Sequence, residues 1–171
     1  MNLILKNCQV KKEIRIETSK GNPIDNYQIF ELSQFEINQF SNYSKEKYPL
    51  VTQRNSPSPI YNCHGMSFAS RRTNIDSSTE IRNILSDDSY EKINEKVTLA
   101  GDLVLYITPD TGDIAHSGTI ISTVHDANNI STIFVVSKWG KYKEVIHNIN
   151  DCPYSNCYKE FYRLTHSNYG N

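Results

Sequence analysis

Hydrophobic residues in the second half of the chain alternate with polar ones or run in short blocks, a pattern that predicts β-strands. Five such segments are LVLYI, AHSGTIIST, STIFVVSKW, KEVIH and KEFYRL, at residues 103–107, 115–123, 131–139, 143–147 and 159–164. The links between the first four are short and rich in Gly, Pro, Asp and Asn, which favours antiparallel hairpins. We therefore predict an antiparallel sheet or half-barrel in this half of the chain.

The first half carries the spacing and capping signals of helices. The pairs Ser33–Glu36 and Ser77–Glu80 have the S-x-x-E spacing of a capping box, and they predict helices to about residues 44 and 86. A third helix is predicted over 63–72 and a further helical turn over 90–93, whereas 10–18 alternates like a half-buried strand. The buried side of the first helix is expected to be formed by Phe35, Ile37 and Phe40. Helices followed by a sheet predict an α+β fold.

Composition fits one globular domain over residues 1–171. Hydrophobic residues make up 37% of the chain and charged residues 22%, which allows a packed core. The formal net charge is −1 and no basic block is present. Nucleic acids and anionic membranes are usually bound by clustered Lys and Arg, so we expect neither as a partner.

Hydrophobic runs are too short for a membrane span. The run Leu103–Ile107 is among the longest, whereas a spanning helix needs ~20 apolar residues. Residues 1–12 lack the long apolar stretch and small-residue cleavage site of a secretory signal. We therefore expect a cytoplasmic protein, a protein exported by a signal-independent route, or a piece of a larger one.

A cysteine and a histidine are placed for nucleophilic chemistry. Cys63 begins the predicted helix in YNCHGMSFASRR, where unpaired N–H groups favour a thiolate, and His116 lies on a predicted strand that would hold an imidazole rigidly. Gly65 costs a helix roughly 1 kcal/mol relative to alanine, so we expect another backbone or a substrate to approach it closely. The alternatives are a buried structural thiol and a core histidine.

Three motifs in order carry a resemblance to a known family. They are Asn62-Cys63-His64-Gly65, then GDLV at 101–104, then His-Ser-Gly at 116–118. Together they resemble the papain-like cysteine peptidase superfamily, especially its NlpC-type and CHAP-type branches, over roughly residues 60 to 147. The chain departs from the family at Asn62, where Asp is usual, and at His64, where Ser is usual. We expect His64 to line the cleft or lie at the surface and not to be the base.

The resemblance implies a papain-like fold and roles for further residues. In SKWG at 137–140, Ser137 matches the position that orients the catalytic histidine and Trp139 the position that shields it, with an ordinary strand residue and a core tryptophan as alternatives. Other candidates for the orienting residue are Asp113, Glu144 and His147. The backbone N–H of Cys63 would serve the oxyanion hole, together with a donor from Asn62 or Tyr61.

The function expected from this resemblance is hydrolysis of an amide bond through a Cys63 thioester, with no cofactor and no metal. Adjacent Cys63 and His64 would make poor joint ligands for a metal that His116 also binds. We favour a protein-cleaving bacterial toxin or effector, which would have an immunity protein as its inhibitor. A peptidoglycan stem-peptide hydrolase, a deamidase or acyltransferase on the same site, and an inactive binding module remain open.

The other three cysteines suggest no disulfide framework. Cys152 and Cys157 are close together in DCPYSNC, and we expect free thiols there rather than a disulfide. The segment around Tyr154 is expected to be loop structure, with the rim of the cleft as the alternative. Cys8 stands alone near the N-terminus.

Overall fold

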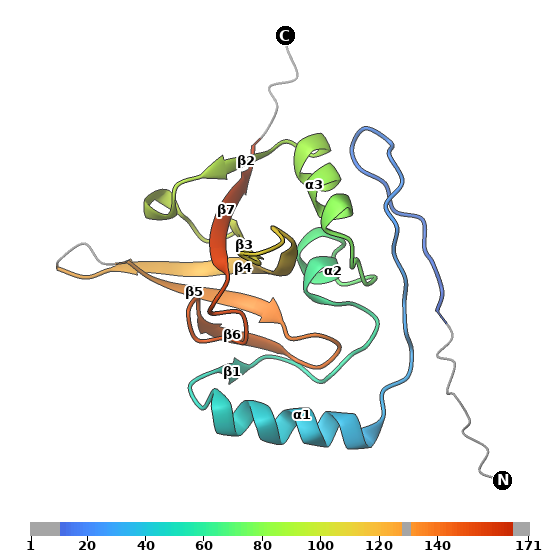
Figure 1. Cartoon of the computed structure of the whole chain (residues 1–171), viewed down its shortest axis with the longest axis vertical. Coiled ribbons are helices and arrows are strands. Elements are labelled where there is room, and N and C mark those ends of the chain that lie inside the picture. The colour runs from blue at the N-terminus through green and yellow to red at the C-terminus, as the bar shows by residue number, and fades with distance from the viewer. Residues whose placement is uncertain (1–10, 128–130, 166–171) are drawn as a thin grey trace.

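The protein has an α+β fold built on one seven-stranded antiparallel sheet, as the sequence predicts (Figure 1). The computed structural model describes residues 11–127 and 131–165, so Cys8 lies outside the described residues. The strand order is β1-β6-β5-β4-β3-β7-β2. The strands are β1 (Thr52–Gln53), β2 (Tyr90–Ile93), β3 (Leu103–Ile107), β4 (Ile114–His125), β5 (Ser131–Lys138), β6 (Glu144–Asn148) and β7 (Tyr158–Leu164).

Hairpins form the centre of the sheet. Strands β3, β4, β5 and β6 pair with their chain neighbours in antiparallel register, because the links between them are short. Strand β7 then returns to the far side of β3, and β2 adds to its outer edge. The five predicted strands are all confirmed, with ends that differ by one or two residues.

Helix α1 (Gln34–Lys47) begins where its capping signal predicts and lies along the β1 edge of the sheet (Figure 1). The Ser33 side chain accepts from the backbone N–H of Glu36, and the Glu36 side chain accepts from the N–H of Ser33. The expectation that Phe35 is buried is wrong, since it is 73% exposed. Phe40 packs against the core, and its ring is stacked on that of Tyr142 at 4.0 Å.

Helices α2 (Cys63–Phe68) and α3 (Ser78–Asp87) cover the sheet near its centre (Figure 1). Helix α2 is shorter than predicted because the backbone turns to positive φ at Ser70 (50°) and Arg71 (64°). Helix α3 is capped by Ser77, whose side chain accepts from the N–H groups of Thr79 and Glu80. It buries its apolar stripe against the sheet, through Ile81, Ile84 and Leu85.

Two predictions of local structure are wrong. Residues 90–93 form β2 rather than a helical turn. Ser89, at φ 61°, turns the backbone out of the helical conformation, and the residues that follow pair with β7. Residues 11–18 belong to no strand of the sheet and make only isolated bridges with a nearby turn, such as Lys12 with Gln28. Local pairing replaces the expected strand there, and residue 10 lies outside the described part.

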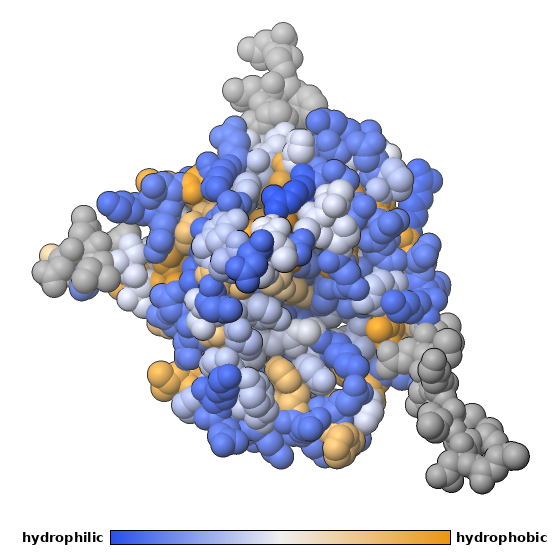
Figure 2. All heavy atoms as spheres, in the orientation of Figure 1, coloured by the Kyte–Doolittle hydropathy of each residue, from blue (hydrophilic) through white to orange (hydrophobic). Residues whose placement is uncertain are grey.

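Hydrophobic cores lie on both faces of the sheet. Along β3, Val104 and Tyr106 belong to one buried cluster and Leu105 and Ile107 to the other, as the alternation of a strand requires. Figure 2 shows a mainly hydrophilic surface with scattered hydrophobic residues. No helix in residues 11–127 and 131–165 is both long and apolar enough to cross a membrane.

The Gly-Asp part of the GDLV motif serves the fold. The Asp102 carboxylate, 5% exposed, accepts from the Arg163 guanidinium at 2.7 and 2.8 Å and from the N–H of Leu99 at 2.7 Å. Gly101 has φ +99°, a conformation that L side chains rarely adopt. This turn fixes the entry into β3 and ties β7 to it.

Candidate active site

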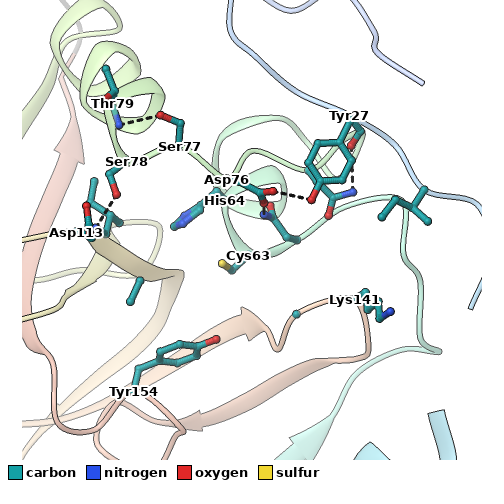
Figure 3. Close-up of a pocket in the computed structure, with 16 residues that line it drawn as sticks. Tyr27, Cys63, His64, Asp76, Ser77, Ser78, Thr79, Asp113, Lys141 and Tyr154 are labelled. Carbon is teal, nitrogen blue, oxygen red and sulfur yellow. Dashed lines mark hydrogen bonds between the residues drawn. The ribbon is translucent and has the colours of Figure 1, made fainter. Parts of the chain in front are cut away.

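An open cleft of about 760 Å³ lies over the start of α2, and the predicted nucleophile lies in its wall. Cys63 and His64 line it together, with Asp76 and Asp113 on the rim and Tyr154 across from the sulfur (Figure 3). The volume lies within the usual range of ligand-binding clefts. The predicted thiol therefore faces a space that can hold a substrate.

Asn62 fixes the backbone at the start of α2. Its side-chain oxygen accepts from the N–H of Gly65 at 2.9 Å, as an N-cap does, and from the N–H of Ile75 at 3.2 Å. Its amide nitrogen donates to the Ile75 carbonyl oxygen at 2.8 Å and to the Asp76 carboxylate at 3.0 Å. Both amide protons are thus engaged, so Asn62 positions Cys63 and has no free proton for an oxyanion.

Gly65 permits the close approach that its presence predicted. A Cβ built on Gly65 would lie 1.6 Å from the carbonyl oxygen of Thr73. The loop after α2 therefore runs directly against the helix, and only glycine leaves room for it. This contact fixes the position of the start of α2 beside the sheet.

The Cys63 thiol is 7% exposed and strongly perturbed. Burial by itself raises its pKa, but the nearby charges of His64 and His116 outweigh burial and hold the pKa well below its usual range. The structure thus brings together Cys63 and His116, as expected, and adds His64. A thiolate flanked by imidazoles is the form of cysteine that attacks carbonyl carbon.

His116 is fully buried behind an aromatic side chain. The Tyr154 ring is stacked on its imidazole at 4.1 Å and 7°, and the Tyr106 ring lies at 5.3 Å. Within the described part of the chain, neither ring nitrogen has a hydrogen-bond partner of good geometry. Tyr154 lines the cleft, whereas His116, stacked beneath it, is not among the residues that line it.

Ser137 is engaged by another histidine. His147 Nδ1 donates to the carbonyl oxygen of Asn148 at 2.7 Å, which leaves Nε2 to accept from the Ser137 hydroxyl at 2.8 Å. Burial lowers the pKa of His147 to about 4, so this ring is neutral. The expected bond from Ser137 to His116 is absent, because the register of β5 and β6 gives that hydroxyl to His147 instead.

The other expected site residues are engaged elsewhere: Tyr61 and Glu144 belong to a largely buried ion-pair cluster, and Trp139 belongs to the core. The Tyr61 hydroxyl donates to the Glu144 carboxylate at 2.9 Å, and the Arg71 guanidinium pairs with the same carboxylate, so neither Tyr61 nor Glu144 bonds to His116. Trp139 is 2% exposed and packs edge-on against Tyr48 at 5.0 Å. Its environment matches the core alternative.

The structure gives His64 a larger part in the site than the sequence predicts. It is 4% exposed, so the surface alternative is wrong, and its Nδ1 lies 2.9 Å from the Ser117 hydroxyl. Burial lowers its pKa, but the charge of Cys63 and a hydrogen bond to the thiol outweigh that, and the net pKa is raised. The sequence signal was its place beside Cys63 in the first helical turn, where both side chains reach the same opening.

Comparison of the chain with protein-family models, with curated proteins and with solved structures finds no match. Across residues 11–127 and 131–165, no group of three or more His, Cys, Asp and Glu side chains is arranged to hold a metal ion. Cys152 and Cys157 are buried free thiols, as predicted, and Tyr154 between them lies at the cleft.

Proposed function

We propose that the chain is a cysteine hydrolase that cleaves an amide bond through a thioester on Cys63. The observation that carries this proposal is a thiol with a strongly lowered pKa, held between two imidazoles on the wall of an open cleft. Perturbed titratable groups in a cleft are typical of active sites. An isolated structural cysteine would instead have its pKa raised by burial, as Cys152 has.

The reaction is an acyl transfer in two steps. The Cys63 thiolate attacks the carbonyl carbon, the carbon–nitrogen bond breaks, and a proton from an imidazolium leaves with the amine. Water then attacks the thioester, an imidazole takes its proton, and the carboxylic acid and free thiol are released. The backbone N–H of Cys63, at the start of α2, is the donor we assign to the oxyanion.

The ordered motifs and the α+β architecture support a papain-like enzyme of the NlpC or CHAP type. A nucleophile at the first residue of a helix, with a histidine on a central antiparallel strand, fits that plan. Within that class we favour a protein substrate and the role of a bacterial toxin or effector. An immunity protein that fills the cleft would be the matching inhibitor.

The first test measures thiol reactivity at pH 6 in the folded chain. Iodoacetamide should label Cys63 much faster than Cys152, as measured by mass spectrometry of the peptides. Cys152 is the matched control because it is also buried and free, and burial raises its pKa. Equal labelling of the two thiols would favour an inactive binding module.

The second test reads the substrate class. Wild type and Cys63→Ala are expressed in a bacterial cytoplasm and, with an added signal, in the periplasm. Death that occurs only in the cytoplasm, needs Cys63 and yields new protein termini supports a protease, whereas lysis only from the periplasm identifies peptidoglycan as the substrate. New Glu or Asp residues without chain cleavage would instead indicate a deamidase.

A further inference from the structure

Two histidines lie beside Cys63, and their surroundings differ. His116 is fully buried against the Tyr154 ring and does not line the cleft, whereas His64 lines it together with Cys63 (Figure 3). The proton of a leaving amine has to be delivered on the cleft side, since that is where the substrate lies. Only one of the two imidazoles is open to that space.

His64 also has the orienting partner that His116 lacks. Its Nδ1 lies 2.9 Å from the hydroxyl of Ser117, which is fully buried on β4. The Ser67 hydroxyl lies 3.1 Å from that of Ser117 and extends the chain of hydroxyls along α2. A catalytic imidazole needs such a partner to fix its ring and its tautomer.

We propose that His64 is the catalytic histidine on the cleft side of Cys63, that it takes the thiol proton and presents it to the leaving group, and that Ser117 positions it. His116 then stabilises the thiolate from the buried side. This inference rests on the proposed function. In the ion pair the proton lies on the His64 ring, its Nδ1–H donates to the Ser117 oxygen, and the Ser117 hydroxyl donates to Ser67.

Other charged and titratable groups surround this pair and set its electrostatics. Asp76, on the loop after α2, favours the protonated form of His64. The Lys138 amine of β5 interacts electrostatically with Cys63 from the sheet side, where its nitrogen donates to the Tyr142 carbonyl oxygen at 2.8 Å. Tyr154 faces Cys63 across the cleft. Its hydroxyl is neutral because burial, and to a smaller extent the charge of Cys63, raise its pKa.

The test measures the pH profile of Cys63 alkylation by iodoacetamide between pH 4 and 9 in the full chain. His64→Gln should move the apparent pKa of the thiol upward by at least about one unit, which slows alkylation about tenfold at pH values below both pKa values. Ser117→Ala and Ser67→Ala should shift it in the same direction by smaller amounts. His147→Gln is the matched control, a buried histidine bonded to Ser137, and should leave the profile unchanged.

A second readout does not need the His64 variant to fold. The imidazole of His64, followed by NMR, should titrate at lower pH in Cys63→Ala than in wild type, because the thiolate that favours its charge is gone. If the His64→Gln profile overlays wild type and His116→Gln alone shifts it, the inference is overturned while the hydrolase proposal stands. If wild-type Cys63 is no more reactive than Cys152, both fail.

Discussion

Replacing Gly65 by alanine tests whether close packing under α2 places Cys63. The new methyl carbon would lie 1.6 Å from the Thr73 carbonyl oxygen, and real contacts of this kind are essentially never below 3.0 Å, so the two must separate by about 1.4 Å. Thr73 is fully buried and its hydroxyl donates to the Asn26 side chain at 2.8 Å, so its carbonyl cannot simply turn away.

The magnitude follows from two opposing terms. Overpacking costs roughly 1–3 kcal/mol, and a backbone obstacle belongs at the upper end. Alanine returns at most about 1 kcal/mol through helix propensity, so Gly65→Ala should lose about 2 kcal/mol net. In a chain of this length that lowers the melting temperature by roughly 4–8 °C.

Urea unfolding followed by fluorescence is the assay, because Trp139 is the one tryptophan of the chain and is 2% exposed. Gly21→Ala is the control, since it adds the same methyl where no atom lies within 4 Å and costs only the strain of φ +82°. In Gly65→Ala the alkylation rate of Cys63 should change as well. An unfolding midpoint equal to wild type would refute the packing argument.

Three further predictions concern buried polar groups. Burial lowers the pKa of His147 to about 4 from about 6.5 in the unfolded chain. The free energy of unfolding should therefore fall by roughly 3 kcal/mol as pH falls from 6.5 through 4. In urea titrations His147→Gln should make the free energy of unfolding depend less on pH over this range. Glu144→Gln should cost roughly 2–3 kcal/mol at pH 7, discounted because the Arg71 side chain is 45% exposed. Burial raises the Glu144 pKa, but hydrogen bonds from Arg71 and Tyr61 outweigh burial and lower it. Wild type therefore loses this stabilisation as the carboxylate is protonated, and the difference in unfolding free energy between wild type and Glu144→Gln should shrink below about pH 4. Asp102→Asn should lower the melting temperature and leave alkylation of the site thiol unchanged, since its carboxylate contacts no residue of the cleft.

The parts of the fold that local pattern could predict are those whose partners are close in sequence. The hairpins from β3 to β6 follow from alternation and short turns, and the start of α1 follows from the Ser33 cap. Strand β2 could not be found this way, because its partner β7 lies about 70 residues later and a four-residue segment fits either period. Phe35 was wrongly expected to be buried, because helical periodicity shows which residues share a helix face but not how much of that face other elements cover.

The same limit applies to the site. Cys63 and His116 could be found from their local contexts, and the close approach at Gly65 from the cost of glycine in a helix. The partner of each imidazole depends on the register of β5 against β6 and on how α2 packs on β4. Sequence alone could therefore nominate Ser137 as an orienting residue but could not show that its hydroxyl belongs to His147.

The three buried histidines in the described part of the chain separate into three states, and their partners explain why. His147 has an acceptor on one nitrogen and a hydroxyl donor on the other, so it is satisfied as a neutral ring whose one N–H is already engaged. His116 is enclosed by aromatic rings with no fixing hydrogen bond. His64 combines a thiol, a hydroxyl relay and an opening to the cleft. Residue type and burial are nearly the same in all three, so the rings differ through their partners, and of the three only His64 both lines the cleft and lies beside a hydroxyl.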